Sequence, residues 1–332
     1  MHATRRERLN PWPDSWPHRL AVTGASGFVG RHLVRAVRDQ GLDVVPLSRS
    51  PGHNRDADYI VVQDYLGTAH LRAAFAGASV VVHLAARAHQ DDGPDATLAY
   101  DLANVKGTRA VAEACHAAGV RRMVLLSSVG VNGNRTHTHP FTEADVPAPV
   151  EAYARSKLEA ERAVIESLAG SRTEFVILRP PLVYGAGCPG NFRLLLRLVH
   201  RLPVVPLGGL HRRRSLIHVE NLCDAILLAA WHPGAAGRTF LLSDGADLSV
   251  AEVARELCRG FGKPVGRVWK LPEPLLRLLA TAVGKRRAID KLAAALAVDS
   301  SAFMAATGWQ PPLTPAQGLE QTARLYLLAQ TS

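Results

Sequence analysis

Tyr153 and Lys157 are the residues whose types and spacing point most directly to chemistry. Residues four apart on a helix share one face, so a helix over this segment would place the phenol beside the ammonium. A tyrosine has an unperturbed pKa of about 10 and is a poor base near neutrality, but a neighbouring positive charge lowers that pKa. The pair therefore predicts proton transfer to or from a sugar or alcohol hydroxyl, with Lys157 lowering the pKa of Tyr153.

A glycine-rich segment far upstream, Thr23-Gly24-Ala25-Ser26-Gly27-Phe28-Val29-Gly30, is typical of a dinucleotide-binding turn between a strand and a helix. Gly24 permits the tight turn, Gly27 lets the backbone approach a pyrophosphate, and Gly30 lets the helix pack on the strand. The exposed N–H groups and the helix dipole would bind the anion. The predicted cofactor-binding residues of this segment are Gly24, Ser26, Gly27, Phe28, Val29 and Gly30.

The elements that must position these residues alternate between strands and helices through the first half of the chain. We predict strands at 19–22, 43–47, 59–62, 79–83, 122–126 and 174–178, and helices at 28–40, 97–118 and 151–168. This alternation predicts an α/β fold of the Rossmann type, a doubly wound parallel sheet with its ligand beyond the carboxyl ends of the strands.

The pattern changes after Arg179-Pro180-Pro181, where prolines and glycines become frequent and helical patterns follow. We therefore predict a flexible arm over 1–17, a cofactor-binding domain over 18–180 and a smaller, mainly helical substrate-binding domain over 181–332. Strands near 215–219 and 239–242 are expected to return to the first domain.

The composition of the 332 residues, 47% hydrophobic and 20% charged, predicts a soluble globular protein without a signal peptide or membrane anchor. The four cysteines are scattered, so we expect reduced thiols, no metal site and a cytoplasmic location. A net charge of +10 would suit anionic partners, or arginines on solvated helix faces. We favour the second interpretation and expect no nucleic-acid partner, because no continuous basic helix with interleaved aromatics occurs.

The glycine spacing, joined to Tyr153 and Lys157, resembles the extended short-chain dehydrogenase/reductase superfamily. More narrowly, residues 20 to about 309 resemble the NAD-dependent epimerase/dehydratase family, which acts on nucleotide sugars. The resemblance also rests on Val82-His83-Leu84-Ala85-Ala86, Asn104-Val105-Lys106-Gly107-Thr108, Leu126-Ser127-Ser128 and Leu178-Arg179-Pro180. It implies NAD(P) as cofactor, a nucleotide sugar as substrate and a homodimer.

The resemblance also implies roles for individual residues. Ser128, Tyr153 and Lys157 would be catalytic, with Lys157 also holding the cofactor ribose. Asp64 would contact the adenine amine and Asn104 would support the active site. The remaining residues implied to lie at the cofactor are Arg49, Leu84, Ala85, Ala86, Ser127 and Pro180.

Substrate binding is implied for Asn191 and Arg214, at positions where the family grips the diphosphate. Arginine suits that role because its planar fork can donate two parallel hydrogen bonds to a phosphate group. The alternative for Arg214 is a solvated basic loop formed with Arg212 and Arg213. Asn132 stands where the family has the Tyr of a Val-Tyr-Gly segment, so it is expected at the sugar pocket, together with Ser128.

Two further departures from the family narrow the chemistry. Val129 and Gly130 stand where dehydratases place a carboxyl pair or at least a Glu, so dehydration is disfavoured. Arg49 follows the second strand near the position where NAD-preferring members carry an Asp, and an Arg there can accommodate the 2′-phosphate of NADP. We therefore expect NAD or NADP.

Three functions are compatible with these residues. A UDP-hexose or UDP-N-acetylhexosamine 4-epimerase would act through a transient 4-keto sugar and is favoured slightly. A 4-ketoreductase would reduce a 4-keto-6-deoxy nucleotide sugar with the same residues. A non-catalytic scaffold that senses NAD(P) is the third, and the intact Ser128, Tyr153 and Lys157 argue against it.

Overall fold

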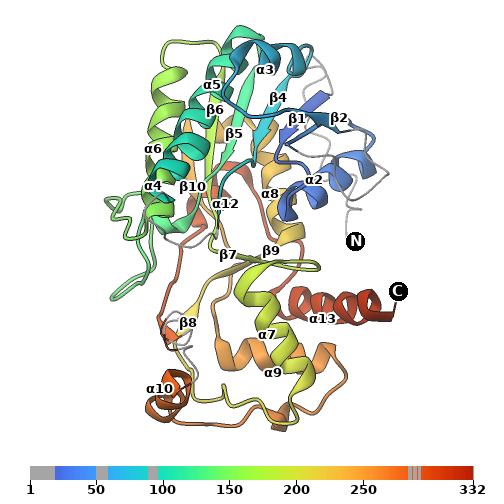
Figure 1. The fold of residues 1–332 in the computed structure, drawn as a ribbon, viewed down its shortest axis with the longest axis vertical. Coiled ribbons are helices and arrows are strands. Elements are labelled where there is room, and N and C mark those ends of the chain that lie inside the picture. The colour runs from blue at the N-terminus through green and yellow to red at the C-terminus, as the bar shows by residue number, and fades with distance from the viewer. Residues whose placement is uncertain are drawn as a thin grey trace.

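The computed structural model describes residues 19–49, 59–88, 96–282 and 293–331, together with Arg286 and Asp290. The arm predicted over 1–17 lies outside these residues. A seven-stranded parallel sheet forms the upper part of the molecule (Figure 1), in the order β10-β6-β5-β4-β1-β2-β3. Its strands are β1 (Arg19–Thr23), β2 (Asp43–Ser48), β3 (Ile60–Val61), β4 (Val80–His83), β5 (Arg122–Leu126), β6 (Glu174–Arg179) and β10 (Arg238–Leu241).

Helices cover both faces of this sheet because successive strand residues point to opposite sides and both sets are apolar. Leu20 and Val22 of β1 join one buried cluster, and Ala21 between them joins the other. The first face carries α2 (Phe28–Asp39), α8 (Val219–Trp231) and α12 (Ser301–Thr307). The second carries α3 (Thr68–Ala74), α5 (Gly107–Ala117) and α6 (Ala152–Ser167). The predicted doubly wound α/β fold is confirmed.

The long helix expected over 97–118 is divided into three parts. These are α4 (Ala96–Tyr100), one π-helical turn (Asp101–Lys106) and α5. Wide π turns are uncommon and occur frequently at functional sites. This one contains Asn104, which is buried.

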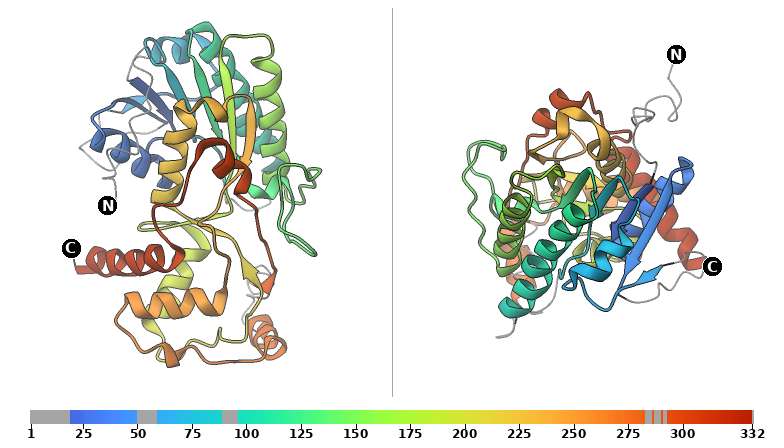
Figure 2. Two further views of the ribbon diagram at one scale, coloured as in Figure 1. Left: turned by 180° about the vertical axis from the view of Figure 1, so that it is seen from behind. Right: turned by 90° about the horizontal axis from the view of Figure 1, so that it is seen from above.

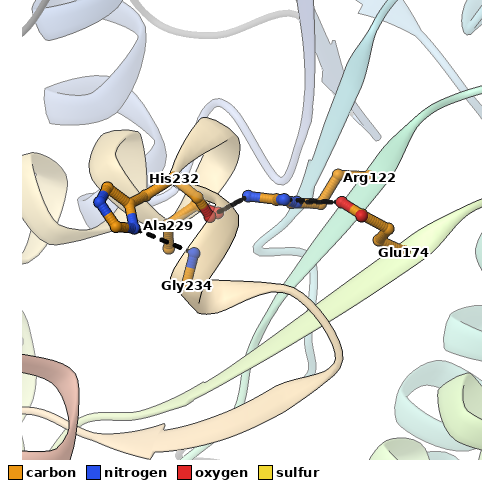
Figure 3. Close-up of polar contacts among 5 residues, drawn as sticks. All are labelled: Arg122, Glu174, Ala229, His232 and Gly234. Atoms are coloured by element: carbon orange, nitrogen blue, oxygen red, sulfur yellow. Dashed lines mark hydrogen bonds and ion pairs between the residues drawn. The ribbon is translucent and has the colours of Figure 1, made fainter. Parts of the chain in front are cut away.

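Arg122, at the start of β5, fastens the end of α8 to the sheet (Figure 3). Its side chain is buried and donates to the carbonyl oxygens of Ala229 (2.9 Å) and His232 (2.8 Å). It also donates to Glu174 on the neighbouring strand through Nε (2.9 Å) and Nη2 (2.6 Å). These bonds satisfy carbonyl groups that the end of a helix otherwise leaves without intrahelical partners.

The other helices and strands of the described residues lie beyond the carboxyl ends of the sheet strands and form a mainly helical part (Figures 1 and 2). Its helices are α7 (Gly190–Arg201), α9 (Val250–Gly260), α10 (Glu273–Ala282) and α13 (Pro315–Thr331). Short strands β7 (Leu182–Tyr184), β8 (Arg213–Arg214), β9 (Leu216–His218) and β11 (Leu248–Ser249) pair as β7 with β9 and β8 with β11. A separate apolar cluster joins α7, α9 and α13. Single 3-10 turns occupy Val129–Val131, Pro233–Ala235 and Val265–Arg267.

The two strands expected to return to the first domain differ in their outcome. The segment near 239–242 supplies β10, which lies beside β6 at the edge of the sheet. The segment near 215–219 supplies β9, which pairs with β7 outside that sheet, so this part of the prediction needs correction. The reason is local: Pro180 and Pro181 end β6, and the chain restarts as β7 in a new ladder with β9.

Candidate active site

A cavity of about 640 Å³ lies at the carboxyl ends of the sheet strands, where β1 is flanked by β4 on one side and β2 on the other. This is the switch point at which open α/β sheets bind ligands. A neighbouring cavity of about 600 Å³ shares Gly24, Gly27, Leu84 and Ala86 with the first, so the two form one groove.

Most of the predicted site residues line this groove. The first cavity is lined by Gly24, Gly27, Phe28, Val29, Gly30, Leu84, Ala86, Ser127, Ser128, Tyr153, Lys157, Pro180 and Arg214. The second adds Ser26, Arg49, Asp64 and Ala85. Asn104, Asn132 and Asn191 are not among the lining residues of either cavity.

The glycine turn has the close approaches expected of a cofactor cradle. Gly24 has a positive φ of 68°, and a Cβ there would lie 2.7 Å from the backbone nitrogen of Ala85. A Cβ on Gly30 would lie 2.3 Å from the carbonyl oxygen of Gly24. Both distances are too short for a side chain, so the turn can close only with glycine at these positions.

The first turn of α2 fits an anionic group such as a pyrophosphate. Its N-cap is Gly27, which has no side chain to bond the free N–H groups, and the first turn contains no acidic residue. Phe28 and Val29 of that turn line the cavity. Backbone donors and the positive end of the helix dipole therefore face a space that a dinucleotide phosphate could fill.

Tyr65 holds the glycine turn in place, a role that the sequence did not suggest. Its hydroxyl accepts from the backbone N–H of Gly24 (3.1 Å) and donates to the carbonyl of Leu47 (3.3 Å). Tyr65 thereby connects the turn to the second strand. A tyrosine in an irregular segment has no spacing that would have marked it.

Among the described residues that line the second cavity, none at the end of β2 carries a carboxylate. Ser48 occupies that end, and its hydroxyl bonds the hydroxyl of Ser26 (2.6 Å). Arg49 follows and is exposed at the cavity. Asp64 also lines the cavity, and one of its carboxylate oxygens accepts from the N–H of Leu66 (2.9 Å).

Lys157 is buried on α6 and its ammonium donates to the carbonyl oxygen of Leu126 at the end of β5 (2.8 Å). Burial lowers the pKa of Lys157 to about 8, while the negative charge of Glu161 raises it. Part of the lysine population is therefore neutral in mildly alkaline solution.

The pKa of Tyr153 corrects one expectation. Burial raises it to about 12, and Tyr100 acts in the same direction. The centroids of the two tyrosine rings are 6.1 Å apart. The physical reason is that removing the phenol from water disfavours the phenolate, while the ammonium of Lys157 is directed at Leu126.

Ser128 caps the short 3-10 turn that follows β5. Its hydroxyl oxygen accepts from the N–H of Gly130 (3.1 Å) and lines the first cavity. This bond uses an oxygen lone pair and leaves the hydroxyl hydrogen able to donate. Capping and a role toward a bound ligand are therefore compatible in this residue.

Asn104 acts behind the cavity wall. Its side-chain oxygen accepts from the N–H of Arg87 (2.7 Å), and its nitrogen donates to the carbonyl of Arg87 (3.1 Å) and to Ser156 (2.9 Å). Ser156 in turn donates to the carbonyl of Tyr153 (2.8 Å). Asn104 thus links the segment after β4 to the helix that carries Tyr153, and it belongs to the support of the site.

Besides Ser128, the three residues expected at the substrate occupy different environments. Arg214 is half-buried in the cavity wall, and burial lowers its pKa. Asn191 is exposed in the first turn of α7, two residues after Pro189, which lines the cavity.

Asn132 is not placed as expected, because its side chain is buried and it is not among the residues that line either cavity. It accepts from Arg179 (3.0 Å) and donates to the carbonyl of Thr142 (3.2 Å). Both polar atoms are used within the protein, so Asn132 is removed from the substrate-binding set.

Sequence patterns also did not indicate the buried ion pair between Arg179 and Glu161. Arg179 donates to both carboxylate oxygens of Glu161, through Nε (2.9 Å) and Nη2 (2.6 Å). The same carboxylate accepts from the hydroxyl of Ser127. Glu161 lies two turns beyond Tyr153 on α6, a spacing that also fits an ordinary surface glutamate.

Comparisons with known proteins identify the family of this chain. Residues 20–242 match the model of the NAD dependent epimerase/dehydratase family. A curated relative from Vibrio cholerae, named UDP-glucose 4-epimerase, is 37% identical over 94% of this chain and 97% of its own length. The chain belongs to the NAD-dependent epimerase/dehydratase family. It is accordingly an NAD(P)-dependent enzyme of the extended short-chain dehydrogenase/reductase type.

Two further matches extend over almost the whole chain. An Escherichia coli O157:H7 protein named N-acetyl-alpha-D-glucosaminyl-diphospho-ditrans,octacis-undecaprenol 4-epimerase is 28% identical, over 91% of this chain and 93% of its own. The solved UDP-glucose 4-epimerase from Brucella ovis in complex with NAD shares the fold, with a TM-score of 0.74 and 24% identity. That match covers 93% of this chain and 98% of the other. Within the described residues, no helix is both long and apolar enough to cross a membrane.

Proposed function

We propose that this enzyme is a nucleotide-sugar 4-epimerase that inverts C4 of a UDP-hexose or UDP-N-acetylhexosamine through a transient 4-keto sugar. The observation that carries the proposal is the single cavity lined by the glycine turn, Ser128, Tyr153 and Lys157. The 37% identical relative named UDP-glucose 4-epimerase supports the same reaction.

The chain's residues have distinct parts in this proposal. NAD(P), when bound, supplies a hydride acceptor and donor, and its oxidised ring carries a positive charge. Tyr153 removes the proton from the C4 hydroxyl as hydride leaves, and returns a proton when hydride comes back. Ser128 donates to the same oxygen and orients it. Lys157 holds the ribose and contributes positive charge beside the reacting groups.

The raised pKa of Tyr153 defines what must change when the site is loaded. A phenol with a pKa of about 12 is almost fully protonated at neutral pH. A positive charge placed in the cavity stabilises the phenolate and lowers that pKa. We therefore propose that Tyr153 becomes a competent base only with oxidised cofactor and substrate in place.

The substrate diphosphate is assigned to Arg214, which lines the cavity and is partly removed from water. A guanidinium there can donate two charge-assisted bonds to phosphate oxygens. Asn191 is retained as a second diphosphate contact. In this scheme 18–180 bind the cofactor, 181–332 bind the substrate, and the enzyme acts in the cytoplasm.

Dehydration is disfavoured by the residues that follow Ser128. Val129 and Gly130 form the 3-10 turn there, so neither position offers a carboxyl group that could eliminate water. The remaining competitor is a 4-ketoreductase, which would use Ser128, Tyr153 and Lys157 in the same way. Arg49 lines the second cavity, where an arginine can bind the 2′-phosphate of NADPH. A reductase consumes NADPH and must exchange it, so this residue favours the 4-ketoreductase.

The direct test is to incubate the purified enzyme with UDP-glucose and with UDP-N-acetylglucosamine and to follow C4 configuration by proton NMR. We expect conversion to the C4 epimer without net consumption of NAD(P)H. The absence of inversion, together with NAD(P)H consumption on a 4-keto-6-deoxy nucleotide sugar, would establish the reductase instead. A scaffold would turn over neither substrate, although it would bind cofactor.

A further inference from the structure

We propose that the buried Glu161–Arg179 ion pair is a positioning device for the catalytic residues. It holds the turn that carries Ser128 against the helix that carries Lys157, and its carboxylate keeps Lys157 protonated. The inference rests on the proposed roles of Ser128 and Lys157, and it adds two residues that touch neither substrate nor cofactor.

The contacts of the pair reach the segments that bear the catalytic groups. Glu161 lies on α6, one turn after Lys157, and accepts from Ser127, the neighbour of Ser128. Arg179 ends β6, immediately before Pro180, which lines the cavity. Its third donor bonds Asn132, which closes the 3-10 turn that Ser128 begins.

The burial of the pair argues against a role in stability alone. The side chains of Arg179 and Glu161 are only 8% and 4% exposed. Removing two charges from water costs several kcal/mol per ion, and well-packed apolar residues of similar volume are often equally stable or better. What an apolar pair could not supply is directional bonds to Ser127 and Asn132 and a fixed negative charge.

The charge of Glu161 acts on Lys157. Among the described residues, Glu161 on the same helix raises the pKa of Lys157, and His83 on β4 is affected by the charge of Lys157. Arg179 on β6 is bonded to Glu161. Burial keeps the pKa of His83 near 3, so His83 is neutral, and Tyr153 is neutral for the reason given above. Glu161 is therefore the negative charge that offsets the cost of burying the ammonium.

The experiment compares wild type with three variants: Glu161→Gln, Glu161→Asp and the double variant E161Q/R179Q. For each we would measure kcat and the pH dependence of NAD(P)H binding by fluorescence between pH 6.5 and 10. The ionisation of Lys157 should appear in wild type with a midpoint of about 8. Lys157→Met serves as the control in which this midpoint disappears.

Glu161→Gln should lower the midpoint by about one pH unit and reduce kcat roughly tenfold. Glu161→Asp keeps the charge but shortens the side chain. Its midpoint should stay close to that of wild type, while kcat falls because the bonds to Arg179 and Ser127 are lost. The aspartate therefore separates charge from geometry even if Glu161→Gln folds poorly.

The double variant distinguishes positioning from a structural role. It removes both buried charges, so its Tm should exceed that of Glu161→Gln and its midpoint should lie between those of Glu161→Gln and wild type, while kcat remains below that of wild type because the bonds to Ser127 and Asn132 are lost. A double variant with wild-type midpoint and wild-type kcat would overturn the inference. So would a Glu161→Gln midpoint equal to that of wild type.

The readouts also separate this inference from the proposed reaction. The midpoint is measured by cofactor binding and needs no sugar. A shifted midpoint in an enzyme that inverts no UDP-hexose would leave the positioning role of Glu161 intact and refute the epimerase. An unshifted midpoint in an enzyme that does invert UDP-hexoses would refute the positioning role of Glu161 and leave the epimerase proposal intact.

Discussion

The ammonium of Lys157 donates to the carbonyl oxygen of Leu126, so α6 is fastened to the end of β5 at the level of the candidate active site. This bond directs Lys157 away from the simple pairing with Tyr153 that the spacing suggested. The lysine fixes the position of its helix and keeps a buried positive charge near the cavity, and Tyr153 extends into the same cavity one turn earlier.

Tyr153→Phe should abolish turnover and preserve cofactor binding. The change removes only the hydroxyl, and losing a general acid–base group typically costs a factor of about 10²–10⁴ in rate. Activity would be followed by C4 inversion, and cofactor affinity by NAD(P)H fluorescence. Equal loss of both properties, or unchanged activity, would contradict the role assigned to Tyr153.

Gly30→Ala should weaken NAD(P) binding more than tenfold and destabilise the fold by about 1–3 kcal/mol. The added methyl would lie 2.3 Å from the carbonyl of Gly24, so the turn would have to open. Gly266→Ala is the matched control, because a Cβ there meets nothing within 4 Å. Calorimetry of both variants and of their cofactor titrations provides the comparison. Similar behaviour of the two would show that close packing at Gly30 does not shape the cofactor site.

Arg49→Ala should weaken NADPH binding about tenfold and change NADH binding less than twofold. The guanidinium is exposed in the second cavity beside a strand end without a carboxylate, a position suited to the 2′-phosphate. Dissociation constants for both cofactors would be measured at fixed ionic strength. Arg72→Ala, an exposed arginine on α3 outside the cavity lining, controls for the loss of one positive charge. A uniform effect on both cofactors would remove Arg49 from cofactor selection.

Acid should destabilise the enzyme partly through His83. Its ring nitrogens bond Thr23 (2.7 Å) and Thr108 (3.0 Å), and burial lowers its pKa from 6.5 to about 3. Between these values the unfolded chain binds a proton that the folded protein does not. Above pH 6.5, His83 is neutral in both states and does not reduce the free energy of unfolding. As pH falls from 6.5 toward 3, protonation of His83 in the unfolded chain lowers the free energy of unfolding.

His83→Gln should remove this effect of pH. The slope of unfolding free energy against pH between 4 and 6 should fall by about 1.4 kcal/mol per pH unit relative to wild type. Urea denaturation at a series of pH values measures it. An unchanged slope would mean that His83 titrates normally in the folded protein.

The sequence was sufficient for the parts of the site that depend on local spacing. Glycines at 24, 27 and 30 directly after a strand specify the turn, and residues 153 and 157 share a helix face in any register. The parallel sheet followed from the alternation of strands and helices.

What the sequence could not predict depends on contacts between distant segments. The sequence around Glu161 is typical of a solvated helix face. Its burial becomes evident only in the fold, where Glu161 accepts hydrogen bonds from Arg179 and Ser127. Asn132 was assigned to the sugar pocket by position, but the fold turns its amide toward Arg179. The pKa of Tyr153 was mispredicted because spacing reveals the neighbouring lysine and not the loss of solvent.

The central claim, that one carbon is oxidised and then reduced within the same cavity, is tested most directly with UDP-glucose deuterated at C4. An epimerase returns the same hydride to the opposite face, so we predict UDP-galactose that retains deuterium at C4. Absence of UDP-galactose, or a product that carries hydrogen from added NAD(P)H in place of the deuterium, would contradict the account.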